Sequence, residues 1–120
     1  MNEPRSEPVA LRFEPSPKRV RVVFAGETVA DSTGVHLLYE GGRPPVYYFP
    51  RDELRMELTE ASDRRTTCPH KGEASYFSIM SKSTTYENAA WSYEDPKADV
   101  AQIKDHIAFY VQDGVAVEML

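Results

Sequence analysis

The sequence predicts a mainly β domain, either a single compact antiparallel sandwich or a partly open barrel, with one or two short helical turns. About nine short segments alternate apolar and polar residues or are dense in β-branched and aromatic residues. Gly- and Pro-containing turns separate them. The stretches between them are too short for the helices that connect parallel strands, which require about a dozen residues or more. A chain of 120 residues fits one domain. We expect a proline-rich arm over residues 1–18 and one β domain over 19–120.

The first half of the domain begins with the clearest strand signal. Val20, Val22 and Phe24 alternate with other residues over 19–24, and Gly26 supplies the positive φ that a tight hairpin turn needs. We expect further strands over 28–31, 35–40, 46–50 and 55–59, a loop over 41–45 and a helical turn over 51–54.

The second half begins with a polar connection over 60–65 and a loop over 68–72, which contains both Pro and Gly. Strands are expected over 75–80 and 84–93, with a turn at 81–83 and a bulge at Asn88. A short helix or turn over 99–104 then leads to a closing hairpin formed by 107–111 and 115–118.

The composition excludes several classes of function. A net charge of −5 and a pI near 5.2 argue against nucleic acid as a partner, because nucleic-acid binding depends on Lys and Arg. No apolar run approaches the roughly 20 residues of a membrane span, and the absence of a secretory signal favours a cytoplasmic location. The single cysteine excludes three- and four-thiolate zinc cages within one chain. We therefore expect no membrane partner, no metal and no cofactor.

The stretch 66–93 gathers most of the residues that could perform chemistry. It contains Cys68, the only cysteine, followed by His70 and Lys71, whose positive charge could favour the thiolate. Cys68 is therefore a candidate nucleophile, and the alternative is a small buried side chain. His70 and Lys71 could bind an anion or transfer a proton, or they could simply belong to an exposed loop. Gly72 would let a ligand approach the backbone.

Aromatic residues are frequent for so small a chain. Trp91 and Tyr93 share one face of a predicted strand and, together with Tyr48 or Tyr76, could line a pocket for a planar ligand. The alternative is that they are core residues. Because Tyr48 faces away from its two neighbours in the strand 46–50, we expect some of these rings to leave the core. His36 and His106 have no metal-binding spacing.

Three separated motifs resemble a known family. Residues 68–76 (CPHKGEASY) and 87–96 (ENAAWSYEDP) are similar to the CPxKGxASY and AWxYxxP signatures of the bacterial domain of unknown function 427. Residues 46–54 (VYYFPRDEL) are similar to its YYFPxxDV segment, with Leu54 in place of Val. The resemblance implies a compact, mostly antiparallel β domain, Mss4-like in outline. It does not imply the zinc chemistry of Mss4-like proteins, which use pairs of CxxC motifs.

Two main hypotheses for the function follow, with a third beside them. The first is a small-molecule-binding domain whose ligand contacts Tyr48, His70, Lys71, Gly72, Tyr76, Trp91 and Tyr93, with Cys68 in the same pocket wall. The second is an enzyme that uses Cys68 as nucleophile or redox centre. The third is a protein-interaction module with an aromatic patch and an unpaired edge strand. A homo-oligomer is compatible with each of them.

Overall fold

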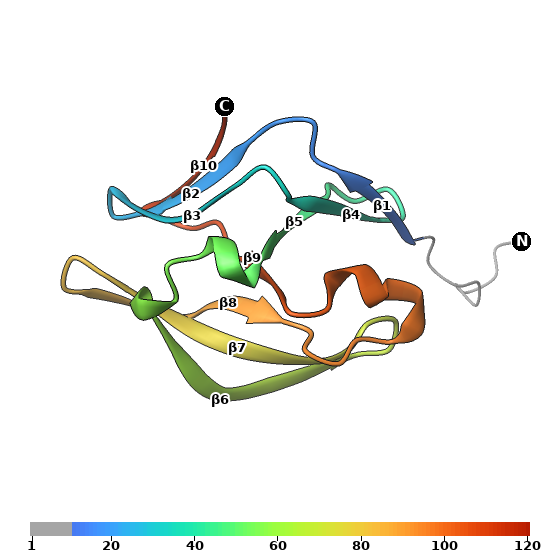
Figure 1. Ribbon diagram of the computed structural model, residues 1–120. Coiled ribbons are helices and arrows are strands. Elements are labelled where there is room, and N and C mark those ends of the chain that lie inside the picture. Colours follow the sequence, from blue (N-terminus) through green and yellow to red (C-terminus); the bar gives the residue numbers. More distant parts are fainter. Residues whose placement is uncertain (1–10) are drawn as a thin grey trace, which may run out of the picture.

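The computed structural model describes residues 11–120, which form ten strands and three 3₁₀ turns (Figure 1). The strands are β1 (Leu11–Pro15), β2 (Val20–Phe24), β3 (Glu27–Ser32), β4 (His36–Glu40), β5 (Val46–Pro50), β6 (Thr59–Cys68), β7 (Gly72–Ser81), β8 (Thr84–Ser92), β9 (His106–Phe109) and β10 (Val115–Met119). The turns are η1 (Arg51–Glu53), η2 (Met56–Leu58) and η3 (Ala98–Ile103).

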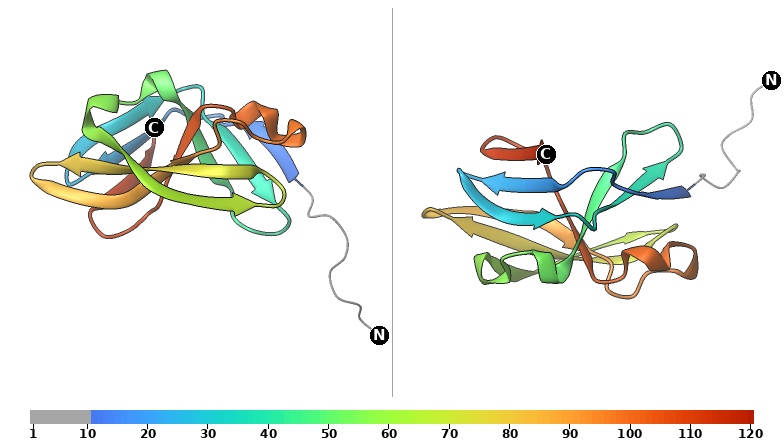
Figure 2. Two further views of the ribbon diagram at one scale, coloured as in Figure 1. Left: turned by 90° about the horizontal axis from the view of Figure 1, so that it is seen from below. Right: turned by 45° about the horizontal axis from the view of Figure 1, so that its top comes forward.

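The strands form two antiparallel sheets. One has seven strands in the order β1-β4-β5-β9-β8-β7-β6, and the other has three in the order β10-β2-β3. The prediction of a mainly antiparallel β domain is therefore confirmed, and in the described range 11–120 the sheets pack as a sandwich rather than close into a barrel (Figures 1 and 2). None of the helical turns in this range is long and apolar enough to cross a membrane.

Two hairpins and one bulge form where the sequence predicts them. The β2–β3 hairpin turns at Ala25 and Gly26, which have φ of 51° and 82°. The β7–β8 hairpin turns at Lys82 and Ser83, with φ of 49° and 69°. Positive φ at both central residues defines the two-residue turn whose twist matches that of paired strands. Asn88, with φ of 52°, lies where the β7–β8 register shifts.

Each face of the seven-stranded sheet carries its own core. The first core lies between the two sheets and includes Val22, Phe24, Phe49, Phe77 and Phe109. The second core lies on the opposite face, where η3 covers it, and consists of Leu38, Tyr48, Ala74, Tyr76, Tyr93, Val100, Ile103 and Ala108. Because both faces are covered, strands such as β5 bury successive residues rather than alternate ones. The rings that we expected to leave the core divide between the two cores instead.

The segment 55–68 differs from the prediction. Residues 56–58 form η2 rather than a strand. The ten-residue strand β6 covers 59–68, of which 60–65 were expected as a polar connection and 68 as the start of a loop. β6 pairs with β7 at the edge of the sheet, and most of its side chains are exposed. A strand held by backbone pairing at an edge needs little apolar alternation, which is why its sequence gives no strand signal.

The two ends of the domain also differ from the prediction. Residues 11–15, which fall in the expected arm, form β1 and pair with β4, while residues 1–10 lie outside the described residues. The expected closing hairpin does not form, because β9 pairs with β5 and β8, whereas β10 crosses to the other sheet and pairs with β2.

Candidate functional site

The aromatic residues singled out in the sequence come together in and around the second core. Tyr48, Tyr76 and Tyr93 are buried in it, and Cys68 and Trp91 pack against it. Trp91 Nε1 donates a hydrogen bond to the Tyr48 hydroxyl at 3.3 Å. The strands β5, β6, β7 and β8 and the bridge residue Tyr93 supply these side chains.

Burial keeps two of these tyrosines neutral. Desolvation raises the pKa of Tyr48, and the hydrogen bond from Trp91 opposes this only in part. Desolvation also raises the pKa of Tyr93, with Cys68 and Tyr76 as further causes. Both hydroxyls therefore act at neutral pH as hydrogen-bonding groups and not as anions.

Lys71 lies beside this cluster and is held by an ion pair. Its Nζ donates to Oε1 of Glu40 at 2.6 Å, and the two side chains are 9% and 20% exposed. The ammonium also lies 5.9 Å from the centre of the Tyr93 ring. The β6–β7 turn places it there, since the Lys71 amide donates to the Cys68 carbonyl at 3.2 Å. The Lys71 ammonium is thus paired with the Glu40 carboxylate and is not a free cation.

Gly72 serves the backbone of this turn. Its φ is 111°, a backbone conformation that residues other than glycine rarely adopt. A Cβ atom at this position would lie 3.5 Å from the Asp95 carbonyl oxygen. The close approach predicted for Gly72 is therefore made by the chain itself, by the segment that follows β8.

A polar hollow opens beside the ion pair. We call it the loop hollow; its volume is about 400 Å³ and it is lined by Glu40, Gly41, Gly42, Arg43, Cys68 and His70. Cys68 is partly exposed there. Of the predicted site residues, Cys68 and His70 line this hollow, whereas Tyr48, Tyr76 and Tyr93 lie in the second core.

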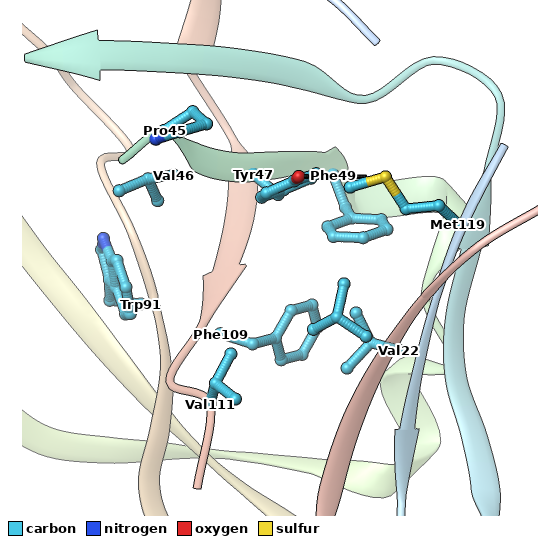
Figure 3. A pocket seen from close by; sticks show the side chains of 10 residues that line it. Val22, Pro45, Val46, Tyr47, Phe49, Trp91, Phe109, Val111 and Met119 are labelled. Atoms are coloured by element: carbon cyan, nitrogen blue, oxygen red, sulfur yellow. Dashed lines mark hydrogen bonds between the residues drawn. The ribbon is translucent and has the colours of Figure 1, made fainter. Parts of the chain in front are cut away.

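An apolar groove opens between the two sheets (Figure 3). This intersheet groove has a volume of about 340 Å³ and is lined by Val22, Pro45, Val46, Tyr47, Phe49, Trp91, Phe109, Val111, Val117 and Met119. Figure 3 shows Phe49, Phe109 and Val22 around its inner part and Trp91 at one end. Trp91 is the predicted site residue that lines this groove.

The sequence could not have pointed to most of these lining residues. The groove joins β2 and β10 of one sheet to β5, β8 and β9 of the other, so it depends on the pairing of β10 with β2. Glu40, at the end of β4, and Arg43, in the β4–β5 loop, line the loop hollow. The two glycines at 41–42 were the one sequence signal that the backbone there is open to a neighbour.

Two histidines that are distant in the sequence also meet. The rings of His36 and His106 lie edge to face with centroids 5.3 Å apart, and Nδ1 of His106 donates to the Lys104 carbonyl at 2.9 Å. Within residues 11–120, no three His, Cys, Asp or Glu side chains are close enough to hold a metal ion. The pair is thus a contact of two imidazoles across β5, which lies between β4 and β9 in the sheet.

A family model described as Domain of unknown function (DUF427) matches residues 12–119. No curated protein matches the chain.

Proposed function

We propose that this chain, which belongs to the family described as Domain of unknown function (DUF427), binds a small, planar and largely apolar molecule in the intersheet groove. The family match confirms the resemblance drawn from the sequence, and its description assigns no activity. The proposal therefore rests on the groove.

The groove carries the proposal because its size and lining suit such a ligand. Small-molecule sites are concave, mostly apolar and roughly 300–1,000 Å³ in volume, and the groove, at about 340 Å³, is at the lower end of that range. Rings from β5, β8 and β9 stand around it, so a flat ligand would find aromatic faces to stack on. The Tyr47 hydroxyl is a polar group within the lining that could fix the orientation of a ligand.

The loop hollow is the weaker candidate for the same role. Its lining carries both signs of charge, on Glu40 and Arg43, and Glu40 is already paired with Lys71. Cys68 lies in its wall, which keeps open the alternative of an enzyme that uses this thiol. The cytoplasmic location and the absence of nucleic-acid and membrane partners remain part of the proposal.

The single tryptophan gives a direct test of ligand binding in the groove. Trp91 is the only tryptophan in the chain, so quenching or a shift of its emission reports on the groove. We expect planar heteroaromatic fragments, screened by protein-observed NMR, to shift amides of β2, β5 and β10 and to change this emission. Val111 is 71% exposed at the groove, so Val111→Asp should weaken binding by placing a charge there while leaving stability nearly unchanged.

Two variants serve as controls. Ala98→Asp adds the same charge on the exposed start of η3 and should leave binding unchanged. Cys68→Ser should also leave groove binding unchanged, because Cys68 lines the other hollow. Fragments that shift only amides around the loop hollow, or that bind Val111→Asp as tightly as the wild type, would refute the groove as the site.

A further inference from the structure

The outer edge of β10 carries backbone groups without a partner strand in the described residues. The amide of Leu120 donates to the Arg19 carbonyl at 2.9 Å, and the amide of Ala25 donates to the Gly114 carbonyl at 2.8 Å. Since residues of an antiparallel strand turn toward a given neighbour at every second position, Ala116 and Glu118 also turn toward β2. The N–H and C=O groups of Val117 and Met119 therefore point away from the sheet.

The other sheet edges are protected. The edge of β3 is covered where the Arg55 amide donates to the Val29 carbonyl at 2.8 Å. β6 is interrupted by a register shift between Ala61 and Arg65, and the Arg65 guanidinium donates to the carbonyls of residues 62 and 64. β1 ends in Pro15 and has a charged pair, Arg12 and Glu14. Bulges, charges, proline and covering segments are the devices that prevent strand addition.

β10 is less protected in the described structure, where the preceding turn takes up only the Val115 amide, which donates to the Gln112 carbonyl at 3.0 Å. It runs Val-Ala-Val-Glu-Met, without proline or lysine, and lies at the outer side of its sheet (Figure 2). Its one charge, on Glu118, is balanced by Arg21 at 3.3 Å. Val117 and Met119 line the intersheet groove, and Met119 is 50% exposed. The backbone groups of Val117 and Met119 at this edge are therefore available to another strand. The charge of Glu118 is neutralised by Arg21, and the face toward the groove is apolar.

The sequence of β10 is complementary to itself in the antiparallel direction. If two copies pair about Val117, that residue faces its own equivalent and exchanges both backbone hydrogen bonds with it. Val115 then lies opposite the partner's Met119, so apolar side chains meet on the groove face. Ala116 lies opposite the partner's Glu118, which keeps the two glutamates from facing each other.

We propose that two copies of this chain pair through β10 to form a two-fold symmetric dimer with a continuous six-stranded sheet. The charge pattern fits a second copy. In the register that pairs Val117 with its own equivalent, each Glu118 lies opposite an alanine, so no like charges face each other. The contact is isologous, so it closes after two copies and does not propagate into a filament.

Sedimentation velocity of the full chain over a wide range of concentrations tests this proposal. We expect the mass to rise with concentration from the 13.6 kDa of one chain to twice that value. Val117→Pro removes an outward-facing amide and leaves every β10–β2 hydrogen bond in place, so it should be monomeric. Circular dichroism checks that this variant folds.

A charge pair at position 116 tests the register without changing the backbone. Ala116 is exposed; Ala116→Glu would face the partner's Glu118 twice in the dimer and should weaken association about fivefold, whereas Ala116→Lys should strengthen it by a similar factor. A chain that stays at the monomer mass at all concentrations overturns the proposal, even if it captures foreign extended peptides at β10. A dimer that persists in Val117→Pro, or that is indifferent to charge at 116, overturns it as well. The masses are measured without added ligand, so a failure of the dimer is distinguishable from a failure of ligand binding in the groove, which the fragment screen tests separately.

Discussion

Lys71 is the one charged side chain that is buried among residues 11–120, and its Nζ lies 2.6 Å from a carboxylate oxygen of Glu40. Removing one member of a buried pair leaves the other charge desolvated and uncompensated. Because Glu40 is one-fifth exposed, we expect Lys71→Met to lower the free energy of unfolding by about 2–3 kcal/mol, somewhat less than for a fully buried pair. Urea denaturation measures this loss, and the double variant with Glu40→Gln should lose less than the two single variants added together.

The exposed pair of Arg12 and Glu14 is the matched control. Their side chains are 58% and 45% exposed, so Arg12→Met should cost at most about 1 kcal/mol. An equal and small loss in Lys71→Met and Arg12→Met would contradict the structural role assigned to Lys71. The sequence identified Lys71 as a notable residue but not its partner, because Glu40 is far away along the chain and only the pairing of strands brings them together.

At the scale of the elements, the bulge in β8 is the feature that the sequence predicted and the structure explains. Asn88 has φ of 52°, its amide donates to Ser78 Oγ at 3.1 Å, and its side-chain oxygen accepts a hydrogen bond from Ser62 of β6. A β-branched residue is strained at this φ, so Asn88→Val should lower the free energy of unfolding by about 1–3 kcal/mol. Thermal and urea unfolding measure the loss.

Glycine separates the backbone effect from the side-chain effect at this position. Asn88→Gly relieves the positive φ but loses the bond from Ser62, so its net change should stay within about 1 kcal/mol. A Val variant as stable as the Gly variant would show that φ does not limit substitution here. Turns and bulges were predictable because their residues act locally, whereas β6 and the pairing of β10 with β2 were not, because they depend on partners elsewhere in the chain.

For the whole molecule, the two cores on the faces of one sheet explain why the fold class could be predicted and the site could not. The short antiparallel strands follow from local alternation and turn residues. A groove forms where side chains from different strands leave space between them. The side chains that line the intersheet groove come from five strands of two sheets, so their arrangement depends on the whole fold. The rings of the stretch 66–93 contribute mainly to packing, and among them only Trp91 reaches the groove.

The stability of the whole molecule should depend on pH through His36. Desolvation lowers the pKa of His36 from its usual 6.5, and the neighbouring His106 lowers it further. A lowered pKa in the folded state means that, as the pH falls through 6.5, the unfolded chain binds the proton more readily than the folded one. The contribution of His36 to the free energy of unfolding should therefore decrease as the pH falls through 6.5 toward the lowered pKa of the folded state. Urea denaturation at a series of pH values measures this slope.

Two histidine variants test whether His36 causes the slope. His36→Gln should flatten it, and His70→Gln, which removes a histidine from the partly exposed β6–β7 turn, should retain it. A wild type whose stability does not change across this range, or a slope that survives in His36→Gln, would show that burial of this imidazole does not couple folding to protonation.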